Sequence, residues 1–421
     1  MISKWRLFIR ELLQKLWVVT ALYAILAVIT NLGAVVIGPL LPSGLGSSLG
    51  SGAVESVLTI LASSMLAVVT FSLGIMVSAF AGAASAVTPR ATTLLKADRT
   101  TQRVLATFLG SFLYSLIGII ALNGGVLTDN DRLVLFMVSI AVVLIVVVVI
   151  LRWIAHLTVF GQMEDSIGKV ETAARRALSI RIKAPYLGGH GHPGAPPPDA
   201  YPVYPSDIGY VRYLHMDWLQ DCAEDLNCQV YVTALPGAFV HPGIAVAYIL
   251  GKTREGGRKI TDAFTIGETR SFEQDPRFGL SVLAEIAQRA LSPAVNDPGT
   301  AIDILGRTIR LLAPLAKDHD PDLKYPNIWV PPLKLEDMMD DIFPPIARDG
   351  AATFAVQMRL QKALLALAQI APARFGQIAL VQAQHAQSRS HDSMLPHERT
   401  AIEATIARTA KLGPTRQRRP V

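Results

Sequence analysis

The sequence predicts an N-terminal α-helical membrane domain with four transmembrane helices, followed by a C-terminal cytoplasmic α+β domain. Four long apolar runs occupy the first third of the chain, and the rest has the mixed composition of a soluble protein. Each run can cross the hydrocarbon core of a bilayer, which takes about 20 helical residues. The loops between the runs differ in charge, which predicts their orientation. The runs are residues 17–41, 54–86, 104–127 and 133–153.

The distribution of Lys and Arg places both termini in the cytoplasm, because basic loops are retained on that side of the membrane. The segment before Trp17 and residues 87–103 are both basic, whereas residues 42–52 carry no charge. The first run is longer than the apolar core of a signal peptide, which has about 7 to 15 residues. We therefore expect an uncleaved, multi-pass membrane protein.

The net charge of +6 and the pI near 9.3 are explained by this topology. Much of the excess lies in the two cytoplasmic loops and in the tail at residues 413–421, where it favours contact with anionic lipid head groups. No aromatic and basic recognition pattern accompanies the charge, so we predict the lipid bilayer and not nucleic acid as a partner. Cys222 and Cys228 fall in the cytoplasmic part, which predicts free thiols.

The second apolar run has a face of small and weakly polar residues, spaced by three or four along a helix. Such a face serves close helix packing, because small residues let backbones approach one another in lipid. It also suits a pore wall, where hydroxyls and carbonyls replace the hydration of an ion. The spans carry no ionisable residue deep in the membrane, which argues against a proton-coupled pump. The face consists of Ser63, Ala67, Thr70, Gly74, Ser78, Ala81 and Ser85.

The C-terminal part divides by composition. We predict a membrane domain at 1–154, a connecting helix at 155–184, a Pro/Gly-rich connector at 185–206, a small β-rich subdomain at 207–274, a helical subdomain at 275–412 and a basic tail at 413–421.

Basic residues gather near the end of the connecting helix, where they suit the helix dipole and the membrane surface. They are Arg175, Arg176, Arg181 and Lys183. The connector carries His190 and His192, but two histidines are too few for a metal site, so neither a metal nor a cofactor is predicted.

Two acid and proline pairs mark helix starts in the C-terminal part. Asp275 with Pro276, and Asp297 with Pro298, each place an N-cap acid before a first-turn proline. Nothing supplies a nucleophile or an oxyanion donor beside these acids, so no catalytic residue is predicted.

Several short motifs together resemble a bacterial family of predicted membrane proteins that is classed as a domain of unknown function. They are Thr-Pro-Arg at 88–90, Asp-Arg-Thr-Thr-Gln at 98–102 and ALSPAVNDPGTA at 290–301. The resemblance implies a four-span membrane protein and supplies no activity, ligand or catalytic residue. We expect the protein to lie in the bacterial inner membrane. A fainter similarity runs from the second span through Arg99 to the pore-helix region of bestrophin-type anion channels. The motif residues of unassigned role are Thr88, Pro89, Arg90, Asp98, Arg99, Ser292, Pro293, Asn296, Asp297 and Pro298.

Two classes of function fit these observations. In the first, several copies assemble as a homo-oligomer around an axis and form an ion channel, because four spans are too few to enclose a wide pore alone. In the second, the spans anchor a cytoplasmic scaffold or sensor that binds a partner. An enzyme ranks third.

Overall fold

The computed structural model describes residues 16–40, 52–96, 98–125, 127–192, 194–251, 256–317 and 322–412. The chain forms two compact units, Met1–Ser166 and Ile167–Val421. The basic segment before Trp17, most of the uncharged loop at 42–52 and the basic tail at 413–421 lie outside the described residues.

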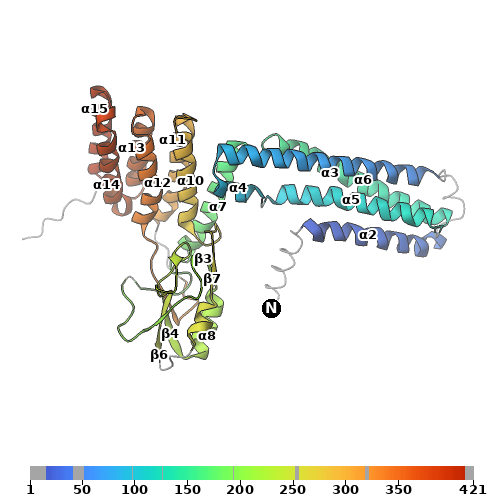
Figure 1. The fold of residues 1–421 in the computed structure, drawn as a ribbon, viewed down its shortest axis with the longest axis horizontal. Coiled ribbons are helices and arrows are strands. Elements are labelled where there is room, and N and C mark those ends of the chain that lie inside the picture. Colours follow the sequence, from blue (N-terminus) through green and yellow to red (C-terminus); the bar gives the residue numbers. More distant parts are fainter. Residues whose placement is uncertain are drawn as a thin grey trace, which may run out of the picture. The chain divides into compact units, whose positions relative to one another are not determined.

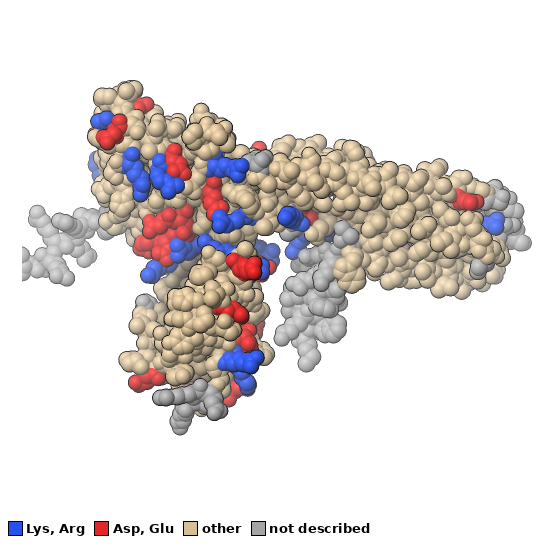
Figure 2. All heavy atoms as spheres, in the orientation of Figure 1, with Lys and Arg blue, Asp and Glu red and all other residues tan. Residues whose placement is uncertain are grey.

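The first unit consists of long helices (Figure 1). Among the described residues, four helices are long and apolar enough to span a membrane, which confirms the predicted spans. Their visible surface is nearly free of charged atoms (Figure 2). The elements are α2 (Leu16–Ile37), η1 (Gly38–Leu40), α3 (Ala53–Ala86), α4 (Pro89–Lys96), α5 (Arg99–Asn123) and α6 (Asp129–Leu157).

Helix α5 is the central helix of this unit. Just over half of its apolar window, 56%, is buried, against 22% for each of the other three spans. Two glycines allow the close approach of its neighbours. A Cβ at Gly110 would lie 2.6 Å from the ring of Tyr23 in α2, and one at Gly118 would lie 2.9 Å from Leu58 in α3. Glycine at these positions therefore lets α2 and α3 pack against α5.

Buried hydrogen bonds join α6 to its neighbours. The indole nitrogen of Trp153 donates to Ser72 Oγ on α3 at 3.0 Å, and Tyr114 on α5 shares a 3.3 Å hydrogen bond with Ser139. The hydrocarbon core contains no water that could take the place of either partner if the helices moved apart. Each hydrogen bond therefore favours one arrangement of the helices.

The chain does not continue as one helix beyond the fourth span, so the predicted helix at 155–184 is wrong at its start. Helix α6 ends at Leu157, and α7 (Met163–Lys183) begins after a turn. Gly161 in this turn has φ 78°, in the left-handed region that glycine tolerates best. A Cβ at Gly161 would also lie 2.8 Å from Ala79, so the turn depends on glycine at this position.

The second unit contains two small sheets (Figure 1). The larger has the order β1-β8-β4-β6-β2, and the smaller has the order β5-β3-β7. Strand β8 pairs in parallel with both β1 and β4, so two distant segments of the chain complete the larger sheet. Its strands are β1 (His190–Gly191), β2 (Tyr201–Val203), β4 (Cys228–Val232), β6 (Ala247–Gly251) and β8 (Ile328–Val330). The smaller sheet contains β3 (Gly209–Leu214), β5 (Phe239–Val240) and β7 (Phe264–Gly267).

The connector at 185–206 is more ordered than its Pro and Gly content predicts, because it supplies β1 and β2. Its histidines do not converge. His190 stacks on Trp329 with ring centroids 4.5 Å apart, and His192 makes a 3.0 Å hydrogen bond with Val232 O. Both are therefore held by the sheet. Short helices α8 (Met216–Asp225) and α9 (Gly257–Thr261) complete this part.

A layer of helices forms the rest of the second unit (Figure 1). Helix α12 contains Pro344 and Pro345 in its interior, where each proline removes a backbone hydrogen-bond donor. The elements are α10 (Pro276–Ala290), α11 (Pro298–Leu312), η2 (Ala313–Ala316), α12 (Leu335–Asp349), α13 (Phe354–Ile370), α14 (Pro372–Ser390), η3 (His391–Ser393) and α15 (Pro396–Ala410).

Candidate functional site

The small-residue face of α3 points away from the other helices of its own unit. The residues that pack inward lie on the opposite side of α3, among them Leu58, Met65 and Ser72. At 100° per residue the small residues fall in a sector of about 80°, and its centre lies roughly opposite the buried sector. Packing among the described helices of this unit therefore does not use this face. Six of its residues are half-buried or exposed, namely Ser63, Ala67, Thr70, Gly74, Ser78 and Ala81, and the side chain of Ser85 lies outside the described structure.

Two hydroxyl groups on this face, those of Ser63 and Thr70, bond to the backbone of α3 itself. Ser63 Oγ donates to Thr59 O at 2.9 Å, and Thr70 Oγ1 donates to Ala67 O at 2.9 Å. A Cβ at Gly74 would meet no atom within 4 Å. At Ser63 and Thr70 the hydroxyl donors are thus satisfied, and the exposed hydroxyl oxygens can accept further hydrogen bonds.

The first group of family motifs forms the turn between α3 and α5. Thr88 is buried, and its hydroxyl accepts from the Ala91 amide at 3.3 Å at the start of α4. Asp98 is the N-cap of α5, where its carboxylate accepts from the amides of Thr100 and Thr101. Its other oxygen lies 3.6 Å from Nε2 of His156 at the end of α6. Pro89, Arg90 and Arg99 are exposed beside this turn.

The second group forms the tight turn between α10 and α11. Asn296 has φ 48°, a left-handed conformation that asparagine adopts more readily than most residues. The Asp297 amide donates to Ala290 O at 2.7 Å, which closes the turn, and Ser292 Oγ donates to Arg289 O. Pro293 is exposed, and Pro298 occupies the first turn of α11.

The N-cap expected at Asp297 is present. Its carboxylate accepts from the Thr300 amide at 3.1 Å and from the Thr300 hydroxyl, whose hydrogen bond lowers the pKa of Asp297 below its usual value. The expected cap at Asp275 is present in the same form, with the amides of Arg277 and Phe278 as donors. Each acid therefore has a structural role that accounts for its position.

Removing the Asp297 cap is expected to destabilise the protein. Asp297→Ala should cost about 0.5 to 2 kcal/mol of unfolding free energy, because the first turn of α11 loses an acceptor. Asp297→Asn should be nearly neutral, since asparagine caps equally well. Thermal unfolding of the detergent-purified protein measures both. An Asn variant as unstable as the Ala variant would show that the charge of Asp297 matters beyond the cap.

Two ion-pair networks in the second unit were not predicted, because their members come from distant segments. In the first, Glu171 on α7 is 6% exposed and contacts three arginines. Its oxygens lie 2.6 Å from Arg175, 2.9 Å from Arg307 and 3.0 Å from Arg310. Burial alone would raise the pKa of Glu171, but the hydrogen bonds from these arginines outweigh it and lower the pKa to about 2. Glu171 therefore joins α7 to α11 as a carboxylate.

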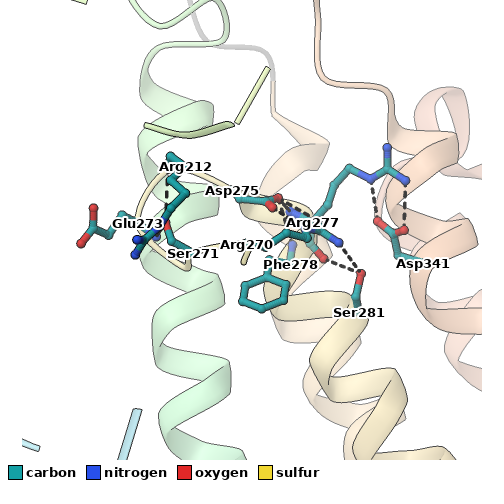
Figure 3. A network of polar contacts seen from close by, with 9 residues as sticks. All are labelled: Arg212, Arg270, Ser271, Glu273, Asp275, Arg277, Phe278, Ser281 and Asp341. Carbon is teal, nitrogen blue, oxygen red and sulfur yellow. Dashed lines mark hydrogen bonds and ion pairs between the residues drawn. The ribbon is translucent and has the colours of Figure 1, made fainter. Parts of the chain in front are cut away.

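The second network surrounds the start of α10 (Figure 3). Arg270 makes a bidentate contact with Asp275 at 2.7 and 3.1 Å, and its guanidinium lies 5.0 Å from the ring centroid of Phe278. Arg277 makes a second bidentate contact with Asp341 on α12, at 2.6 and 3.0 Å. Arg270 and Arg277 are thus each paired with a carboxylate, and these two bidentate ion pairs hold neighbouring elements together.

The fold and these sites define a membrane protein with four candidate spans and a C-terminal α+β unit. The chain belongs to the family described as "Predicted membrane protein (DUF2254)", which it matches over residues 14–366. This confirms the resemblance seen in the sequence motifs.

The chain is also similar to curated proteins from two mycobacteria. An uncharacterized protein of Mycobacterium tuberculosis and another of Mycobacterium bovis are each 31% identical to it over 137 residues. The match covers 31% of this chain and 26% of each relative, so it spans about a quarter of the length of these proteins. No solved structure matches the chain.

Proposed function

We propose that the protein is a homo-oligomeric ion channel of the bacterial inner membrane, in which α3 of each copy lines the path. The observation that carries the proposal is the exposure of the small-residue face, from Ser63 to Ala81, on the side of α3 opposite its own helix partners. A face built for packing within the chain would be buried there. Around an axis formed by several copies, the same face offers hydroxyl oxygens and room for an ion.

The proportions of α3 support this role. Its 34 residues extend about 50 Å, which exceeds the hydrocarbon core of about 30 Å. Large apolar side chains flank the small-residue face, among them Leu66, Phe71 and Val77, which are 47%, 69% and 65% exposed. Such residues suit contact with lipid or with a second copy, while the small residues between them leave space.

The proposal includes a topology with both termini in the cytoplasm, supported by the basic segments on that side. A reporter attached after Val421 should be protected in intact cells and should become accessible after permeabilisation. An externally accessible tail would contradict this orientation.

The mass and symmetry of the detergent-purified particle, with ion flux after reconstitution into liposomes, test the channel proposal. We expect a closed ring that conducts a small anion or cation. A monomer, or a ring that conducts neither, would favour the alternative of a membrane-anchored sensor or scaffold. One observation favours that alternative: the second unit contains a basic pocket of its own, lined by Arg181, Lys317 and Arg374.

A further inference from the structure

A pocket of about 300 Å³ opens in the second unit, where the end of α7, the segment after α11, the start of α12 and α14 meet. Three of its lining residues are cationic, and no acidic residue lines it among the described part of the chain. The rest of the lining is largely apolar. Residues that define its character are Arg181, Lys317 and Arg374 on the basic side, with Tyr186, Leu333 and Met338 on the apolar side.

Arg181 is the unusual member of this lining. It is 5% exposed, yet no described carboxylate pairs with it. Nη2 donates a long 3.4 Å hydrogen bond to Pro331 O, and Nε is buried without a partner. Burial lowers the pKa of Arg181 to about 10, so the side chain is still a cation at neutral pH. The sequence predicted that Arg181 suits the helix dipole and the membrane surface. It does lie in the last turn of α7, but its side chain is buried inside the second unit and not at a surface.

An unpaired buried charge is costly, and proteins ordinarily remove the cost with a partner. The same unit does so at Glu171, where three arginines surround one carboxylate. The position of Arg181 in the last turn of α7 is favourable for a cation, but it leaves Nε without an acceptor. Arg181 is therefore arranged for an acceptor that no described residue supplies.

The surroundings of Arg181 favour a dianion. Lys317 and Arg374 add positive charge, and Arg374 is positioned by a hydrogen bond from Nη1 to Leu315 O. The first turn of α12 also lines the pocket, and its N-cap residue Lys334 makes no side-chain cap. That turn also carries Glu336 and Asp337, whose carboxylates offset the attraction of the helix N-terminus for negative charge, so the positive charge at the pocket comes from its three cations.

We propose that this pocket binds a phosphate monoester with a small apolar body. The phosphate would accept from Arg181, whose planar group matches phosphate geometry, and its charge of about −1.5 to −2 would more than offset the single positive charge of Arg181. The apolar body would lie against Tyr186, Leu333 and Met338. The phosphate can belong to a soluble ester or to a phosphatidic acid head group. The proposal rests on the second unit alone and is independent of channel activity.

The test uses the full-length protein in detergent and measures its thermal unfolding with inorganic phosphate, phenyl phosphate or dioctanoyl phosphatidic acid, against matched sodium chloride. We expect phenyl phosphate or phosphatidic acid to raise the unfolding temperature of the wild type more than inorganic phosphate does. A response to phenyl phosphate identifies a soluble ester as sufficient, and a response to phosphatidic acid alone identifies the lipid head group.

Arg181→Met separates binding from a structural role. We expect it to weaken binding of the responding phosphate compound by at least about tenfold, because the charge-assisted hydrogen bonds are lost. Without phosphate, this variant should be as stable as the wild type or more stable, since methionine removes an unpaired buried charge at similar length. If Arg181 instead stabilises the fold, Arg181→Met should be less stable than the wild type in the absence of phosphate.

Two further variants complete the test. Lys317→Gln changes an exposed residue of the pocket and should weaken binding severalfold without affecting folding. Lys362→Gln removes an exposed charge on α13 that does not line the pocket, and its effect should stay within about twofold. The proposal is overturned when none of the three phosphate compounds stabilises the wild type, or when Arg181→Met and Lys317→Gln bind as tightly as the wild type.

Discussion

Ser78→Trp is expected to stop ion flux through the assembled protein. Ser78 lies in the exposed face of α3, so each copy would add an indole ring to the proposed path and narrow it. Flux in reconstituted liposomes should fall by at least about tenfold, while the oligomer keeps its mass in detergent. If the face instead serves close packing between copies, the same change should break the oligomer, because a bulky residue holds helix backbones apart.

Leu73→Trp is the matched control for this prediction. Leu73 is 41% exposed and lies about 100° around α3 from the centre of the small-residue face. The same side chain placed there should leave both flux and assembly close to wild type. Undiminished flux in an assembled Ser78→Trp protein would argue that α3 does not line the path.

Glu171→Gln is expected to lower the thermal stability of the protein by about 10 °C, because three arginines would lose their common acceptor. A drop of the pKa from 4.5 to about 2 corresponds to about 3 kcal/mol of stability. This contribution is fully present above pH 4.5, where the unfolded glutamate is also ionised, and is lost as the pH falls towards 2. Unfolding in detergent, followed by tryptophan fluorescence, measures the effect.

Glu164→Gln is the control for Glu171. It makes the same change on the same helix, but its side chain is exposed. We expect a change in the unfolding temperature of no more than about 3 °C. The difference between wild type and Glu171→Gln should shrink as the pH is lowered from 5 to 2. A difference that is small at pH 7, or that grows on acidification, would contradict the ionised, arginine-paired state of Glu171.

The sequence predicted features that depend on neighbouring residues. The four spans follow from the length of the apolar runs, since the thickness of the bilayer dictates that length. The caps at Asp275 and Asp297 follow from contacts within one helical turn. The break at Gly161 was missed because the apolar and amphipathic patterns continue across it.

Features formed by distant residues could not be predicted in this way. Strand β8 lies far along the chain from β1 and β4, and no local pattern indicates their pairing. The partners of Glu171 and the burial of Arg181 likewise depend on how α7 packs against later helices. The sequence identified the small-residue face of α3, but it could not show whether that face turns towards the neighbouring helices of its own unit. In the structure, the small-residue face lies on the side of α3 opposite the helices of its own unit.

The chain provides a favourable background for cysteine labelling of this face. Cys222 and Cys228 are free and buried, and burial raises the pKa of both thiols, which slows their reaction with methanethiosulfonates. Replacing both with alanine removes the remaining background reaction. Ser78→Cys and Leu73→Cys then report on two sides of the same helix.

The current through a planar bilayer containing the reconstituted Ser78→Cys protein, before and after a charged methanethiosulfonate is added, tests the channel proposal most directly. The proposal predicts a measurable current that the reagent blocks in Ser78→Cys and leaves unchanged in Leu73→Cys. Absence of current from assembled wild-type protein, or a current that modification of Ser78→Cys leaves unaltered, would contradict a conducting path along this face of α3.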